Sequence, residues 1–197
     1  MTANGPAKPA GASLPLLAVA DRAELRSWLE HNHASSPGVN LAIGKKGGHA
    51  TALTYDDAVE EALCFGWIDS TARRLDDDRY TALYTPRKRG GTWARTNKAR
   101  VERLIAEGQM TPAGIAVIEA AKSDGSWTVL EDAENLVVPD DLAAALERAE
   151  ARERFDALAA SARQMALYWI STAKRDATRA ERVSSTVTAA LEGRGPR

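Results

Sequence analysis

The residues that could do chemistry concentrate between positions 64 and 97, which read CFGWIDSTARRLDDDRYTALYTPRKRGGTWARTN. Asp69 and Arg73 fall on the first strand of a predicted hairpin, and Tyr80 and Tyr84 lie at even spacing on the second. Carboxylate, guanidinium and phenol groups on one face could hold a polar ligand, but cross-strand charge pairs also simply tie hairpins together. The candidate ligand-binding residues are Trp67, Asp69, Arg73, Tyr80, Arg87, Trp93 and Asn97.

A basic run follows the hairpin, from Arg87 to Arg103, and Glu102 is its one acidic residue. Gly90 and Gly91 would let the backbone approach a ligand, and a helix is predicted to begin near Thr92. Helix N-termini and guanidinium groups both favour anions, so the run is a candidate site for a phosphate or carboxylate. The alternative is a solvated helix face beside a loop.

Sequence motifs that name a cofactor or a reaction are missing: there is no G-x-G-x-x-G, P-loop, H-E-x-x-H, C-x-x-C or G-x-S-x-G. We therefore expect no cofactor and no metal site. His31 and His33 are expected to interact with a helix C-terminus, His49 to lie in a loop, and Cys64 to be a buried, unreactive thiol. Asp69 is the candidate acid or base if the protein is an enzyme, which the missing motifs disfavour.

The composition is that of a globular protein: 197 residues, 44% hydrophobic, with a formal charge of −1 and one cysteine. The near-neutral charge disfavours a surface that binds nucleic acid throughout. No apolar run approaches the roughly 18 residues that span a bilayer, so no membrane insertion is expected. Residues 14–20 imitate a signal peptide poorly, because Pro15 interrupts the apolar run. A reducing cytoplasm is the expected location.

Hydrophobic periodicity predicts a mainly helical α+β fold in which a small antiparallel sheet or hairpin packs with helices and an all-helical part follows. The expected domains are a flexible tail at 1–13, an α+β core at 14–130, and a helical part at 131–197 packed on the core. The expected strands cover 39–43, 67–74 and 79–85, and the expected helices 21–33, 54–66, 92–108, 112–118, 140–149, 152–173 with a candidate break near Ser161, and 176–192.

Several separated strings resemble the YdeI/OmpD-associated family, also called bacteriocin-protection proteins. They are EALCFGWID, the TPR of residues 85–87, LIAEGQMTPAG and ALYWISTAKRDATRAERV, and the resemblance extends from about Leu14 to Gly193. It implies a bacterial cytoplasmic protein without an assigned reaction, whose fold begins at Leu14 to Ala20. Asn40 and Ser70 depart from the family pattern, which puts ligand preference in doubt. The matched motif positions are Trp67, Asp69, Tyr80, Arg87, Trp93 and Asn97.

These observations leave three hypotheses open. The first is a non-catalytic cytoplasmic binding or stress-tolerance protein, linked to bacteriocin or antimicrobial-peptide tolerance, that holds a small anionic ligand or acidic peptide group among arginines and aromatic rings. The second is an enzyme that acts on a small anionic substrate through Asp69. The third and weakest is nucleic-acid binding through residues 87–103, which would depend steeply on salt. The oligomeric state stays open.

Overall fold

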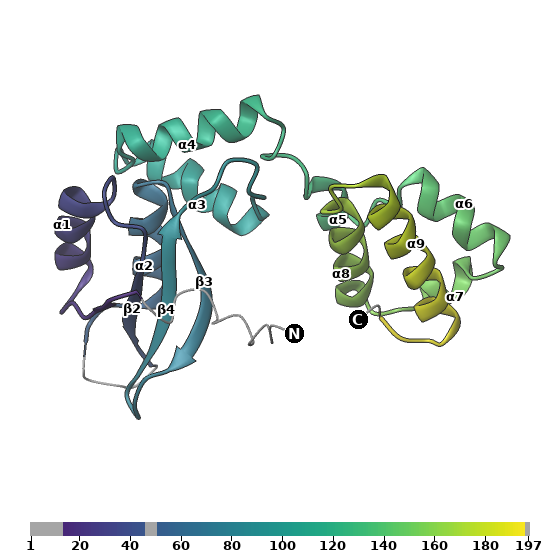
Figure 1. The fold of residues 1–197 in the computed structure, drawn as a ribbon, viewed down its shortest axis with the longest axis horizontal. Helices are drawn as coiled ribbons and strands as arrows, with labels where there is room; N and C mark the ends of the chain where they lie inside the picture. Colours follow the sequence, from purple (N-terminus) through teal and green to yellow (C-terminus); the bar gives the residue numbers. More distant parts are fainter. Residues whose placement is uncertain (1–13, 46–50, 196–197) are drawn as a thin grey trace, which may run out of the picture. The chain divides into compact units, whose positions relative to one another are not determined.

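The computed structural model describes residues 14–45 and 51–195, so the predicted tail at 1–13 and His49 lie outside the described residues. The described chain forms two compact units (Figure 1). The first contains residues up to Gly91 together with Thr96–Ser123, and the second contains Thr92–Arg95 together with the residues from Asp124 onward. The packing of the helical part on the core stays a prediction.

The first unit is built on a four-stranded sheet with the strand order β1-β2-β4-β3. The two pairs β2–β4 and β4–β3 are antiparallel, as predicted, whereas β1 runs parallel to β2, so the sheet is mixed. A helix lies between β1 and β2 in the chain, which is the kind of connection that parallel neighbours need. The strands are β1 (Leu16–Leu17), β2 (Val39–Gly44), β3 (Trp67–Arg74) and β4 (Arg79–Pro86).

One face of this sheet is apolar because β2 is buried along nearly its whole length. Val39, Leu41 and Ile43 are at most 2% exposed, and they pair with Tyr84, Ala82 and Tyr80 of β4. The helices α1 (Arg22–Asn32) and α2 (Tyr55–Cys64) supply partners for this core.

Both helices begin at the caps that the sequence indicates. The Asp21 side chain accepts from the Glu24 N–H, and Thr54 and Asp57 form a reciprocal capping box. The capping box fixes where α2 starts, and it therefore sets which α2 residues reach the sheet.

Two further helices complete the first unit, α3 (Arg95–Ala106), whose first residue is counted in the second unit, and α4 (Pro112–Ser123). The start of α4 is tied to the end of α2, since both the backbone N–H and the hydroxyl of Thr111 donate to the Cys64 carbonyl, at 3.1 and 2.6 Å. Gly114 makes this approach possible. A Cβ on Gly114 would overlap the Cys64 carbonyl oxygen and lie 2.8 Å from its carbon.

We therefore expect Gly114→Ala to destabilise the protein by about 2 kcal/mol, because overpacking against a backbone group forces a helix to shift. The sign is informative, since alanine is intrinsically better than glycine inside a helix by about 1 kcal/mol. Urea unfolding measures the change. A stabilising Gly114→Ala would show that α4 does not press on α2.

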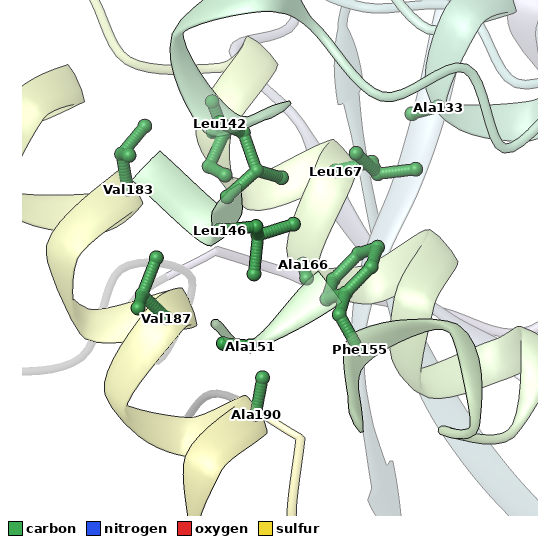
Figure 2. Close-up of a cluster of buried hydrophobic side chains, with 11 residues drawn as sticks. Ala133, Leu142, Leu146, Ala151, Phe155, Ala166, Leu167, Val183, Val187 and Ala190 are labelled. Atoms are coloured by element: carbon green, nitrogen blue, oxygen red, sulfur yellow. The ribbon is translucent and has the colours of Figure 1, made fainter. Parts of the chain in front are cut away.

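The second unit is helical, with a core that gathers side chains from short helices (Figure 2). The predicted helix at 152–173 is split into α7 and α8, and the break lies just before the candidate position near Ser161. A short helix at 131–134 was not predicted. The helices are α5 (Glu131–Glu134), α6 (Asp140–Arg148), α7 (Arg152–Asp156), α8 (Ala160–Ser171) and α9 (Asp176–Leu191).

The structure confirms the predicted fold class: a mainly helical α+β protein with a small sheet and a helical C-terminal part. Within residues 14–45 and 51–195, no helix has both the length and the apolar character needed to cross a membrane.

Candidate functional site

A β-bulge decides which hairpin residues share a face of the sheet. Asp69 lies opposite Tyr84, and after an irregularity between Asp69 and Ala72 the register resumes with Arg73 opposite Thr81. Because side chains alternate along a strand and a bulge shifts that alternation by one residue, Asp69 shares a face with Tyr80 and Tyr84, and Arg73 lies on the other face. The structure therefore brings Asp69 and Tyr80 together and separates Arg73 from them.

Asp69 lies at the centre of a group of tyrosines. Its Oδ2 accepts a hydrogen bond of 2.9 Å from the hydroxyl of Tyr55, the first residue of α2. Burial and this hydrogen bond raise the pKa of Tyr55 to about 12, and burial and the Asp69 charge also raise the pKa of Tyr80. Both phenols are therefore protonated at neutral pH and can donate hydrogen bonds.

Tyr84 forms the inner layer of the group. Its side chain is buried, and its hydroxyl has no hydrogen-bond partner among the described residues. Burial, followed by the nearby Asp69 charge, raises the pKa of Tyr84 far above its usual range. A buried hydroxyl without a partner is unusual, because such groups in native proteins are nearly always satisfied.

Two arginines supply positive charge to the same group. Burial lowers the pKa of Arg87 to about 10, and the Asp69 charge opposes this effect, so Arg87 is still a cation at neutral pH. The Arg87 backbone N–H donates to the Gly66 carbonyl at 2.9 Å, which fixes the chain where β4 ends. Arg100, from α3, donates to Asp56 at 2.6 Å and to Asn97 at 3.2 Å, and its charge lowers the pKa of Tyr55 and Tyr84.

We call this group the tyrosine–arginine site; it consists of Tyr55, Asp69, Tyr80, Tyr84, Arg87 and Arg100. Sequence reasoning assigned three of these to the site, Asp69, Tyr80 and Arg87, and noted Tyr84 as a neighbour on the same strand. It missed Tyr55, and it counted Arg100 only as a member of the basic run; these two residues come from separate helices. The start of α2 was predictable from its capping box, but no local signal shows that it meets β3.

The remaining predicted site residues have other surroundings. Trp67 is a core residue, only 1% exposed, whose indole N–H donates to the His33 carbonyl at 3.2 Å. Asn97 accepts a hydrogen bond from Arg100, and this is its link to the site among the contacts of the described residues. Trp93 belongs to the second unit, where its ring centroid lies 4.9 Å from that of Trp127. It is therefore not counted among the residues of this site, which belong to the first unit.

At least three of the seven cations in the basic run from Arg87 to Arg103 pair with carboxylates of the protein itself. Arg100 pairs with Asp56, and Arg103 pairs with Glu60 and Glu107. The helix of this run begins at Arg95 and not near Thr92, and the Arg95 N–H donates to a Glu134 carboxylate oxygen at 2.7 Å. The anion expected at this helix N-terminus is thus the Glu134 carboxylate of the protein itself.

The two described histidines lie at the C-terminal end of α1, and the cysteine is in the core. His31 and His33 each place Nδ1 within 2.8 Å of a carbonyl one turn earlier in α1. Cys64 is fully buried, and burial raises its pKa to about 11, so the thiol is unreactive at neutral pH. In the described part of the chain, no cluster of three or more His, Cys, Asp or Glu residues could hold a metal ion.

Comparison with protein families gives a different match for each half of the chain. Residues 17–117 match a domain of unknown function (DUF8412), and residues 135–193 match the family described as bacteriocin-protection, YdeI or OmpD-associated. Neither the curated proteins nor the solved structures gave a match. The resemblance seen in the sequence is thus confirmed in the helical C-terminal part. Residues 135–193 thus match a family whose description names bacteriocin protection, and the chain itself belongs to the DUF8412 family, whose model covers just over half of it.

Proposed function

We propose that this protein is a non-catalytic cytoplasmic binding protein that holds an anionic group of a small ligand or peptide at the tyrosine–arginine site. The observation that carries the proposal is the buried Tyr84 hydroxyl without a partner among the described residues. A ligand oxygen could satisfy this group. The link to bacteriocin tolerance comes from the family description of the second half.

The phenol donors of the site favour a hydrogen-bond acceptor as the ligand group, and the Arg87 charge favours an acceptor that is an anion. The Asp69 carboxylate is the acceptor of the site, and it already receives the Tyr55 hydroxyl. What the site can offer to a ligand are the phenol donors of Tyr80 and Tyr84 and the positive charge of Arg87. Hydrogen bonds to a charged partner are about twice as strong as those between neutral groups.

Access to Tyr84 requires neighbouring side chains to move, because Tyr84 is only 2% exposed. Tyr55 is 42% exposed and Tyr80 is partly buried, so a ligand reaches these two phenols first. Side chains at the surface change rotamer on the picosecond to nanosecond scale, so this movement does not require the sheet to open.

A cytoplasmic location is part of the proposal. The chain has a single cysteine, Cys64, which is buried and reduced, and a reducing compartment suits such cysteine usage. Nucleic-acid binding is the weaker alternative, since the formal charge of the chain is near neutral and Arg95, Arg100 and Arg103 of the basic run pair with carboxylates.

A second candidate function is catalysis by Asp69. The observation that favours catalysis is that Asp69 is partly buried and accepts a hydrogen bond from a phenol. An Asp69 in a fully solvated ion pair at the surface would have excluded this role. Against it, the pKa of the partner phenol is raised to about 12, well away from the neutral range in which acid–base catalysts work best. Turnover that Asp69→Asn abolishes while ligand binding persists would favour this alternative.

We expect Tyr84→Phe to weaken ligand binding about tenfold without destabilising the free protein. The ligand loses one hydrogen bond to a buried donor, worth about 1.4 kcal/mol, whereas the protein loses none, since the hydroxyl has no described partner. Thermal unfolding against phosphate, nucleotides, acidic peptides and short DNA, at low and physiological salt, measures both effects. A ligand at about 100 times its dissociation constant adds roughly 2.7 kcal/mol.

Arg87→Ala and Arg73→Ala form the matched pair of controls. Arg87 belongs to the site, so its loss should abolish the stabilisation by the anion, whereas Arg73 lies on the opposite face and its loss should leave binding unchanged. If Tyr84→Phe binds every ligand as the wild type does, the site is not where we place it. If the variant without ligand is less stable by 1 kcal/mol or more, the hydroxyl is satisfied within the protein.

A further inference from the structure

A groove in the second unit lies between α6 and α9 and has a volume of about 650 Å³. This is the size of sites that hold small organic molecules. Its apolar surface comes from Val183 and Val187 of α9, which are 7% and 9% exposed, and from Ala145 and Ala149 of α6. The alanines leave room beside the two valines, so an apolar chain could lie along the groove. We call this feature the α6–α9 groove.

Of the two arginines that line the groove, Arg179 has a carboxylate partner and Arg148 has none in the described ranges. At one end Arg179 donates two hydrogen bonds to Asp141, at 2.6 and 3.0 Å, and these hydrogen bonds, with the Arg179 charge, hold the pKa of Asp141 below its usual range. Arg148 also lines the groove, yet it makes no ion pair with any residue in the described ranges. A cation without a protein counter-ion is therefore available to an anionic ligand.

The position of Arg148 gives the groove a direction. Arg148 is the last residue of α6 and Asp141 the second, so about 10 Å of helix separates them. Asp176, the first residue of α9, lies near the Asp141 end, since Arg179 of the same helical turn pairs with Asp141. A negative headgroup is thus repelled from the Asp176 end and attracted to the Arg148 end.

We infer that the α6–α9 groove binds an amphipathic carboxylate, such as a medium-chain fatty acid. The carboxylate pairs with Arg148, and the hydrocarbon chain covers Val183 and Val187 and runs toward the Asp141 end. Removing the hydrocarbon chain of the ligand from water favours the bound state, and the charge pair sets the orientation. This site goes beyond the proposed function, because it lies wholly in the second unit and uses no residue of the tyrosine–arginine site.

The test is isothermal titration of the full chain with decanoate below its micelle-forming concentration. We expect Arg148→Gln to raise the dissociation constant roughly tenfold, the loss of one charged hydrogen bond. Arg152→Gln is the matched control, because Arg152 is an exposed arginine that pairs with Asp156 and does not line the groove. Decanol, which lacks the charge, should bind wild type and Arg148→Gln equally.

A second variant tests the apolar part of the groove. Ser184 lines it from an exposed position, so Ser184→Trp should fill the space and weaken both decanoate and decanol without loss of stability. The inference is overturned if decanoate does not bind the wild type, or if it binds Arg148→Gln equally well. It is also overturned if the wild type forms a dimer that Ser184→Trp dissociates while decanoate has no effect, since a second copy of the chain would then occupy the groove.

Discussion

Phe155→Ala is expected to lower the free energy of unfolding of the second unit by about 4 kcal/mol. Phe155 is 0% exposed, and it lies in the cluster that also contains Leu142, Leu146 and Leu167 (Figure 2). Truncating a buried phenylalanine removes its transfer free energy and leaves a cavity that short helices fill only in part. Since α7 has only five residues, Phe155 is also its one buried anchor.

The measurement is urea unfolding followed by circular dichroism and by tryptophan fluorescence. Because the chain consists of two compact units, we expect the variant to shift the transition of the helical unit and to leave that of the sheet unit in place. Glu153→Ala, an exposed position on the same short helix, is the control and should change stability by less than about 0.5 kcal/mol. A loss below about 1 kcal/mol for Phe155→Ala would mean that this core is loosely packed.

The same substitution separates the two proposed binding sites. Val183 and Val187 belong both to this core and to the α6–α9 groove, so loss of the core should remove decanoate binding under conditions where the helical unit unfolds. Anion binding at the tyrosine–arginine site should persist there, since that site lies in the first unit. Simultaneous loss of both activities would show that the two units fold as one.

Local sequence signals predicted the parts of the fold that local chemistry decides. The Thr54–Asp57 capping box started α2 where the sequence indicated, and the alternation of Val39, Leu41 and Ile43 gave a buried strand. The two-residue strand β1 was not predicted, because two residues carry no periodicity; the family resemblance implied only that the fold begins at Leu14 to Ala20.

The parts that sequence could not supply depend on contacts between distant segments. A bulge in β3 moved Arg73 to the opposite face, and strict alternation gives no warning of an inserted residue. The carboxylates that neutralise the basic run, Asp56, Glu60 and Glu134, lie about 40 positions from their arginines. A basic run therefore predicts a binding surface from sequence, although in the folded protein Arg95, Arg100 and Arg103 already pair with carboxylates.

A second large effect is expected at Glu61, where Glu61→Ala should destabilise the first unit by about 3 kcal/mol. The Glu61 side chain is 2% exposed and accepts hydrogen bonds from Arg22 at 2.7 Å and from Arg26 at 2.9 Å. Its replacement removes two hydrogen bonds between charged groups, each worth about 1.5 to 3 kcal/mol, and both arginines keep other partners that offset part of the loss. The two bonds join α1 to α2, which carries Tyr55 at its start.

The chain supplies its own control, because Arg26 has an exposed partner as well. Glu30 lies 3.6 Å from Arg26 and is 53% exposed, so Glu30→Ala should change stability by less than about 0.5 kcal/mol, an effect that disappears at high salt. The effect of Glu61→Ala should persist at high salt, since buried pairs are poorly screened. A double-mutant cycle of Arg26→Ala with Glu61→Ala should give a coupling of 1 kcal/mol or more, whereas additive losses would show that Glu61 acts only through packing.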